Sequence, residues 1–149
     1  MHAFTYSLYH CVWSTKGRHP LLGPEIQTRL WPYLGGIARA NRMSALAVGG
    51  VADHVHILLS LPPTQSISKA IQLLKGNSSK WLHEEFAELR TFSWQEGYGA
   101  FTIGMSGVPE TKNYIGTQAE HHKKKTFQEE FKSFLDKHGL TYDEAILWH

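Results

Sequence analysis

The segment from residue 53 to residue 61 constrains the fold of this 149-residue chain more than any other part of the sequence. It reads Asp-His-Val-His-Ile-Leu-Leu-Ser-Leu, and a strand places successive side chains on opposite faces of a sheet. One face then carries His54 and His56, while the other carries Val55, Ile57, Leu59 and Leu61. We therefore predict a strand over 54–61 that is apolar on one side and presents two imidazoles on the other, a geometry that suits a metal ion held above a sheet.

The pattern of the remaining chain predicts a single α+β domain over residues 1–149. Strands are expected over 4–14, 44–52, 54–61 and 98–104, where β-forming residues lie between turn residues. Helical spacing predicts helices over 25–41, 67–86 (disturbed at Gly76-Asn77), 108–125 (capped by Ser106) and 127–138. The resulting order is βαββαβ followed by two helices. It indicates a ferredoxin-like, RRM-like antiparallel sheet with two additional C-terminal helices.

In a ferredoxin-like fold two helices cover one face of the sheet and leave the other face open. The apolar side of the 54–61 strand must lie under those helices, so His54 and His56 are expected on the open face. The helix over 108–125 can then approach them from the same subunit or from a neighbour. Structural or surface histidines are the alternative. Asp53 is expected to begin a turn, and orienting a histidine is its second interpretation.

The basic residues are clustered, as in 121–125, although the formal net charge is only +2. Such clusters indicate a polyanion partner more than the net charge does, and a solvated basic surface is the equal alternative. Cys11 is the one cysteine, which excludes an intrachain disulfide and favours a reducing compartment. No signal-peptide pattern and no apolar run of about 18 residues is present. We expect a cytoplasmic protein without a membrane partner.

One stripe of the predicted 108–125 helix carries unusual chemistry. Tyr114, Gln118, His121 and Lys125 follow the spacing i, i+4, i+7 and i+11 and share one helix face. A phenol, an amide, an imidazole and an amine are poor core material. The stripe is therefore either a solvated surface or part of a functional site.

Taken together, these motifs resemble the HUH superfamily, and within it the single-tyrosine transposases of small insertion sequences that move as single-stranded DNA. The resemblance covers nearly the whole chain. It rests on four runs: Asp53-His54-Val55-His56; Trp94-Gln95-x-Gly97-Tyr98-Gly99-Ala100-Phe101; Tyr114-Ile115-x-x-Gln118-x-Glu120-His121-His122; and Phe127-Gln128-Glu129-Glu130-Phe131.

The resemblance implies an enzyme that nicks and rejoins single-stranded DNA. Tyr114 would attack a backbone phosphate and form a 5′-phosphotyrosine link with a free 3′-hydroxyl. A divalent ion, Mg²⁺ or Mn²⁺, would be held by His54, His56 and Gln118. His121 is the alternative third ligand. From ligand chemistry alone, manganese, zinc or nickel would be expected for such a set.

The same resemblance implies a homodimer whose active sites are completed in trans, and DNA hairpins at the element ends as partners. Candidate DNA-binding residues are Lys75, Lys80, Tyr98, His121, Lys124 and Lys125. Three other functions compete with the active transposase. They are a catalytically silent single-strand nucleic-acid-binding module, a domesticated relative that processes repeated hairpins, and a metal-dependent hydrolase without a covalent tyrosine.

Overall fold

The computed structural model describes residues 4–121 and 125–143, and its centre is one four-stranded antiparallel sheet. The strands, in the spatial order β2-β3-β1-β4, are β1 (Ser7–Ser14), β2 (Ser44–Val51), β3 (His54–Leu61) and β4 (Gly99–Thr102). The α-helices are α1 (Pro24–Ala40), α2 (Ile67–Glu85), α3 (Val108–Gly116), α4 (Gln118–His121) and α5 (Phe127–Lys137). This strand order and connectivity confirm the ferredoxin-like α+β fold.

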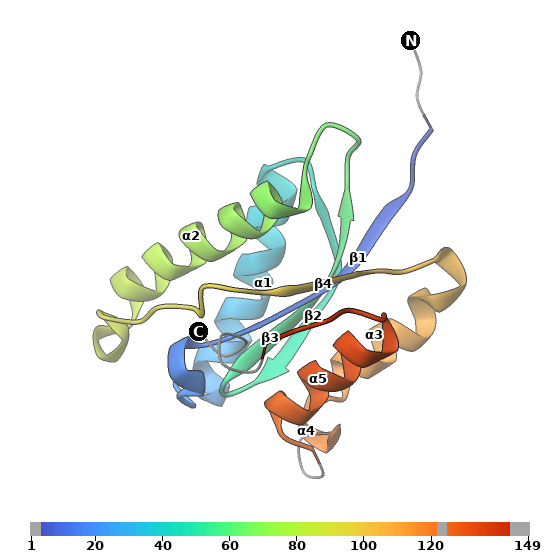
Figure 1. Ribbon diagram of the computed structural model, residues 1–149. Helices are drawn as coiled ribbons and strands as arrows, with labels where there is room; N and C mark the ends of the chain where they lie inside the picture. Colours follow the sequence, from blue (N-terminus) through green and yellow to red (C-terminus); the bar gives the residue numbers. More distant parts are fainter. Residues whose placement is uncertain (1–3, 122–124, 144–149) are drawn as a thin grey trace.

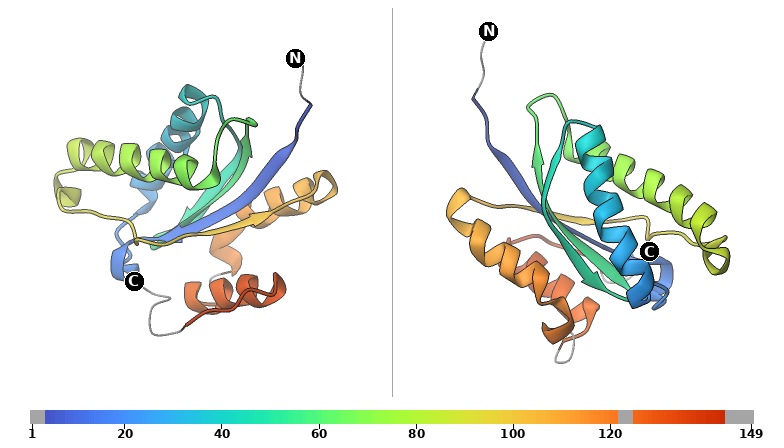
Figure 2. Two further views of the ribbon diagram at one scale, coloured as in Figure 1. Left: turned by 45° about the horizontal axis from the view of Figure 1, so that its top comes forward. Right: turned by 180° about the vertical axis from the view of Figure 1, so that it is seen from behind.

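The helices form a layer on each side of the sheet (Figure 1). Helices α1 and α2 cover one face, and the two views of Figure 2 place α3, α4 and α5 against the other. The face predicted to be open is therefore covered. None of the helices in the described ranges is long and apolar enough to span a membrane.

The α1/α2 face holds the main hydrophobic core. As the alternation predicted, Val55, Ile57 and Leu59 of β3 point into it and are fully buried. Leu34 of α1 and Leu74 of α2 meet them from the helix layer. Each fully buried aliphatic side chain of this kind contributes about 1.5–3 kcal/mol relative to exposure.

Ser66 is the N-cap of α2, and its side chain accepts a hydrogen bond from the Lys69 amide. The helix then runs without interruption from Ile67 to Glu85. The expected disturbance at Gly76-Asn77 is wrong. Glycine inside a helix costs only about 1 kcal/mol relative to alanine, and α2 packs along its whole length. The Asn77 amide also stays within the helix, where it donates to the Leu73 carbonyl.

The helix expected over 108–125 is also corrected. Helix α3 ends at Gly116, Thr117 leaves helical geometry, and α4 is a single turn, so Lys125 lies outside both helices. The Thr117 hydroxyl bonds back to the Asn113 carbonyl, which favours termination after a glycine of low helix propensity. Ser106 is not the cap, because it lies in a 3₁₀ turn and Gly107 occupies the N-cap position.

Helix α5 begins where the sequence predicted. Thr126 and Glu129 form a reciprocal capping box, in which each side chain bonds the backbone amide of the other residue. The helix ends at Lys137, and Gly139 follows with φ of +67°. This well-defined start fixes which α5 side chains face the sheet.

Candidate functional site

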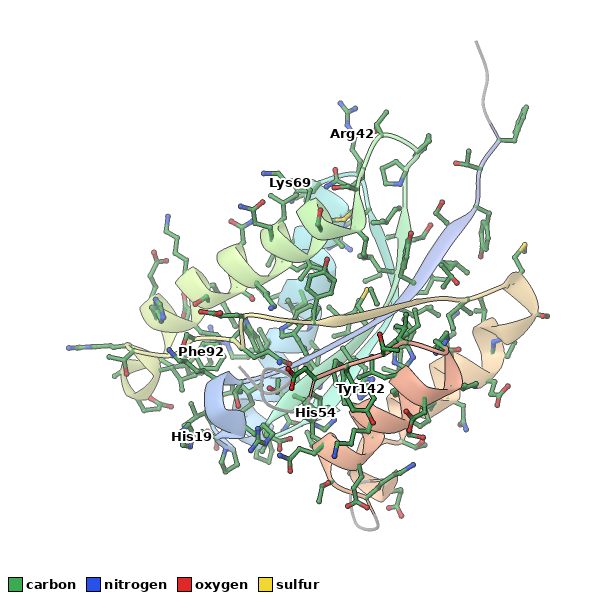
Figure 3. All side chains as sticks on the ribbon, in the orientation of Figure 1. His19, Arg42, His54, Lys69, Phe92 and Tyr142 are labelled. Carbon is green, nitrogen blue, oxygen red and sulfur yellow. The ribbon has the colours of Figure 1, made fainter. Side chains whose placement is uncertain are left out.

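The histidine pair lies between the sheet and the C-terminal helices. His54 and His56 are both fully buried, and β1 sets their surroundings by pairing Ser14 with His54 and Val12 with His56. A second, smaller apolar cluster closes this face, consisting of Val12, Phe101, Phe127, Phe131 and Leu135. This apolar contact explains why the C-terminal helices cover a face that a minimal ferredoxin-like unit leaves open. Figure 3 shows His54 on this side of the sheet, opposite Lys69 of α2.

Two glycines let the helices come this close. A Cβ atom on Gly49 of β2 would lie 2.5 Å from the Ile115 carbonyl oxygen of α3. A Cβ atom on Gly99 of β4 would lie 2.7 Å from the Phe131 ring of α5. The absence of a side chain at both positions therefore sets the height of α3 and α5 above the sheet.

The Nδ1 atoms of His54 and His56 each contact a polar side chain from the strand side of the site. The Asp53 carboxylate lies 2.7 Å from His54 Nδ1, so Asp53 orients a histidine in addition to its place in the β2–β3 turn. His10 of β1 places its Nε2 atom 2.7 Å from His56 Nδ1. Such contacts fix the ring orientations and direct both Nε2 atoms towards the helices.

The Nε2 atoms meet oxygen atoms from α4 and α5. Gln118 Oε1 lies 3.2 Å from His54 Nε2, and Glu130 Oε1 lies 2.9 Å from His56 Nε2 and 3.6 Å from His54 Nε2. The ligand atoms of His54, His56 and Glu130 all fall within 4.8 Å of one another. The structure thus brings Gln118 to the predicted pair and adds a carboxylate.

The orientation of Gln118 argues that a cation fits here. Its amide nitrogen donates to the Tyr114 carbonyl, which turns its oxygen towards His54. Because Asp53 accepts the Nδ1 proton of His54, Nε2 carries a lone pair in the neutral ring, and two acceptors face each other. A cation between them satisfies both, and the nitrogen and oxygen donors suit a divalent ion.

Tyr114 of α3 reaches the same cluster. Its hydroxyl donates a short hydrogen bond to Glu130 Oε2, and its ring packs edge-on against His10, His56 and Phe134. Burial, the hydrogen bond to Glu130 and the charge of Glu130 together raise the pKa of the Tyr114 phenol. The phenol is therefore protonated at neutral pH and acts as a donor in this arrangement.

Sequence reasoning assigned no role to Glu130 or His10, both of which are buried in the site. His10 lies two residues from Val12 on one face of β1, but only the β1–β3 register shows that this face is the histidine face. Glu130 lies three positions after Phe127 and directly before Phe131, within the amphipathic pattern of α5. A charged residue on the apolar side of a helix is the signal that could have identified it.

The remaining predicted residues are dispersed. Lys75 donates to the carbonyl oxygens of Gln95 and Gly97 at 2.8 Å, and burial lowers its pKa to about 8. Tyr98 lies beside this ammonium and is about one-third exposed. Lys80 and Lys125 are exposed on different parts of the chain. Lys124 and the His121 side chain lie outside the described residues, and the DNA-binding roles stay predictions.

A pocket of about 420 Å³ opens beside the nucleophile candidate, between β4, α3 and α5. Tyr114 and His10 line its inner end, and Phe134, Lys137 and His138 line the α5 side. His54 and His56 do not line it. The described structure thus offers solvent a route to Tyr114, whereas the histidine pair is enclosed.

With this geometry in hand, comparison with known proteins assigns a class. Residues 3–118 match the model of the family described as "Transposase IS200 like". The chain belongs to this family of transposases. The matched segment contains His54, His56, Tyr114 and Gln118, and it ends before α5.

Individual relatives agree with this assignment. The chain is 30% identical over 121 residues to the ISDra2 transposase TnpA of Deinococcus radiodurans, covering 77% of this chain and 86% of the relative. It is 32% identical to the transposase for insertion sequence element IS200 of Salmonella typhimurium, covering 77% and 78%.

Two solved structures share the fold. A crystal structure from Deinococcus radiodurans, described as that of a transposase, has a TM-score of 0.66 at 28% identity and covers 79% of this chain and 95% of its own. A REP-associated tyrosine transposase bound to a REP hairpin has a TM-score of 0.60 at 15% identity, with coverages of 82% and 73%. The second match supports the fold alone.

Proposed function

We propose that this transposase nicks and rejoins single-stranded DNA at insertion-sequence ends through a 5′-phosphotyrosine intermediate, with the assistance of a divalent metal. The observation that carries the proposal is the shared carboxylate of Glu130, which places the Tyr114 hydroxyl beside the histidine pair. Phosphoryl transfer to a side chain needs a nucleophile close to a bound cation. Here the same carboxylate contacts both the Tyr114 hydroxyl and the histidine cluster.

Tyr114 is the proposed nucleophile. Its phenolic oxygen forms a bond to the scissile phosphorus, and the bond from phosphorus to the 3′ oxygen of the preceding nucleotide breaks. The phenol loses its proton to solvent as the bond forms, and the 3′ oxygen takes a proton from water and leaves as a hydroxyl. The phosphotyrosine diester conserves the bond energy, so rejoining needs no nucleotide cofactor.

His54, His56 and Gln118 are the proposed metal ligands. A bound Mg²⁺ or Mn²⁺ would stabilise the negative charge that develops on the phosphate. Asp53 and His10 hold the imidazoles in the orientation that such binding needs. Two imidazoles alone favour softer ions such as zinc or nickel. The oxygen donors of Gln118 and Glu130 make the ligand set more suitable for harder ions such as Mg²⁺ and Mn²⁺.

Hairpin DNA and a second subunit are the proposed partners. Hairpins are proposed from the family resemblance; the structural neighbour bound to a REP hairpin shares the fold of this chain. The Tyr114 ring of α3 lies edge-on against His56 of the same chain. Completion in trans by a homodimer, and a cytoplasmic location, stay predictions.

A denaturing gel tests the nucleophile. The protein and MnCl₂ are mixed with labelled single-stranded DNA that carries the element ends flanking the gene. We expect a covalent protein–DNA band in the wild type and in the control Tyr33→Phe, on α1, and no band in Tyr114→Phe. Cleavage that persists in Tyr114→Phe would contradict the phosphotyrosine mechanism and favour a metal-dependent hydrolase. Hairpin binding without any cleavage by the wild type would favour the silent binding module.

A further inference from the structure

We infer that Glu130 is a positioning residue that couples the nucleophile to the metal: one carboxylate oxygen is a further ligand at the histidine pair, and the other holds the Tyr114 hydroxyl. The inference rests on the proposed function and adds the C-terminal helix to the active site. Helix α5 begins after the segment that matches the family model, so a part of the chain outside that match contributes this carboxylate.

The bridging geometry carries the argument. Glu130 Oε1 lies 2.9 Å and 3.6 Å from the Nε2 atoms of His56 and His54, and Glu130 Oε2 accepts the hydrogen bond from Tyr114. The two oxygens belong to one rigid planar group. The Tyr114 oxygen therefore cannot move away from the histidine pair without breaking this bond or displacing the carboxylate.

Helix α5 is built to hold that carboxylate in place. Phe127 and Phe131 stack on each other and flank Glu130 along the helix, and both belong to the apolar cluster on the sheet. Leu135 continues the same buried stripe, one turn further on. The aromatic contacts thus fix the depth at which Glu130 enters the site, leaving its side chain only 3% exposed.

Burial of a carboxylate at this position calls for positive charge nearby. An ionised carboxylate removed from water is costly unless it is paired or coordinates a metal. Among the described residues, the Nε2 atoms of His56 and His54 lie 2.9 Å and 3.6 Å from Glu130 Oε1. A divalent cation between these groups would place positive charge beside Oε1, while Oε2 holds the Tyr114 hydroxyl.

Metal binding without DNA gives the first test. Mn²⁺ titration followed by electron paramagnetic resonance compares the wild type with Glu130→Gln and Glu130→Asp. The matched control is Glu129→Gln, which removes one charge from the exposed side of the same turn. It keeps a side-chain oxygen that can accept the capping hydrogen bond from the Thr126 amide. We expect Glu130→Gln to weaken Mn²⁺ binding at least tenfold, Glu130→Asp to recover part of it, and the control to match the wild type.

Single-turnover kinetics give the second test. At saturating Mn²⁺ and saturating single-stranded element-end DNA, we expect Glu130→Gln to form the covalent complex at least tenfold more slowly. The affinity for the DNA, measured in Ca²⁺, is expected to change less than threefold. A residue that only supported the fold would lower the active fraction instead, with the rate constant of the remaining protein unchanged.

A double-mutant cycle on thermal unfolding gives the third test and needs no activity. Because Tyr114→Phe and Glu130→Gln both disrupt the same hydrogen bond, between the Tyr114 hydroxyl and Glu130 Oε2, the double variant is expected to lose clearly less in Tm than the sum of the single losses. Strict additivity would contradict the coupling. Tyr98→Phe combined with Glu130→Gln serves as the additive control.

Two outcomes would overturn the inference. In the first, Glu130→Gln matches Glu129→Gln in both Mn²⁺ affinity and rate. In the second, Glu130→Gln cleaves faster than the wild type, which would mean that the carboxylate occupies the place of the scissile phosphate. If the wild type itself forms no covalent complex, the proposed function fails, whereas the Mn²⁺ titration and the Tm cycle still decide whether Glu130 couples Tyr114 to the metal cluster.

Discussion

The two faces of the central sheet are both buried, yet they are built from opposite materials. The face under α1 and α2 is an almost wholly apolar core. The face under α3, α4 and α5 combines a small aromatic cluster with five buried polar side chains, His10, His54, His56, Gln118 and Glu130. Alternate residues of β3 therefore differ in their surroundings: its odd-numbered positions belong to the apolar core, and His54 and His56 belong to the candidate site.

Physical chemistry explains why the two surroundings are kept apart. Apolar burial is non-directional and gains stability in proportion to area, whereas buried polar groups cost free energy unless each finds a partner. On the site face both ring nitrogens of His54 and of His56 face a polar group, provided by Asp53, His10, Gln118 and Glu130. Stability there depends on a network, and the loss of one member leaves others buried without a bond.

Removal of an imidazole should have the largest effect on function. We expect His56→Ala to lose detectable Mn²⁺ binding and to slow covalent-complex formation by at least about 10³-fold, because the metal-supported charge stabilisation disappears. The control Ser60→Ala lies on the same face of β3 and should keep both properties. Gel assays and Mn²⁺ titration measure the difference. Normal Mn²⁺ binding by His56→Ala would refute the assignment.

A cavity in the core under α1 and α2 should lower stability without lowering Mn²⁺ affinity. Leu59→Ala removes a fully buried side chain from the α1/α2 core and is expected to lower the free energy of unfolding by about 2–5 kcal/mol. The folded fraction should still bind Mn²⁺ with wild-type affinity. Urea denaturation and metal titration together check the prediction. A large loss of Mn²⁺ affinity in the folded protein would show that the faces are not independent.

The close approach of α3 to β2 allows a sharper test. Gly49→Ala places a methyl group against the Ile115 carbonyl, so we expect a loss of about 1–3 kcal/mol in stability together with a displaced Tyr114 and slower cleavage. Gly76→Ala, on α2, meets no atom within 4 Å and is expected to be neutral or stabilising by up to about 1 kcal/mol. Equal behaviour of the two variants in urea denaturation would contradict the packing argument.

Acid should weaken the site face through His10. Burial, aided by the neighbouring His56, lowers the His10 pKa from 6.5 to about 3. Below about pH 6.5 the unfolded chain binds a proton at His10 and the folded chain does not. The contribution of His10 to the free energy of unfolding is therefore complete above pH 6.5 and falls as the pH drops towards 3. With a chelator present, we expect a loss of about 2 kcal/mol between pH 7 and pH 5. Urea titrations should show a smaller loss in His10→Gln, and an unchanged loss would contradict the assignment.

The smallest effects are expected from single surface lysines. Lys125 directly precedes Thr126, the N-cap of α5, whereas Lys80 belongs to α2, which covers the other face of the sheet. Removal of one phosphate contact lowers the slope of log K against log salt concentration for DNA binding by about 1. We therefore expect Lys125→Ala to weaken binding to single-stranded DNA modestly and Lys80→Ala to weaken it less. A larger effect for Lys80→Ala in salt titrations would place the DNA across the α2 side.

Much of the fold and half of the site follow from local sequence. The bounds of β3, the two faces of that strand and the capping box of α5 were predicted correctly, because a two-residue period and a capping motif are properties of neighbouring residues. The family and its tyrosine and histidine motifs were recognised for the same reason. The prediction of a continuous 108–125 helix was wrong, since Gly116 and the Thr117 hydroxyl end α3 against the apolar pattern.

By itself, the sequence determined which side chains β3 presents on each face and which residues are candidates for metal binding and for the nucleophile. Only the tertiary structure decided that the histidine face is covered, that His10 supports His56, and that Glu130 joins Tyr114 to the pair. The reason is physical. Periodicity arises from bonds between neighbours, whereas the pairing register of β1 and the docking of α5 are settled by contacts between residues 46 to 74 positions apart.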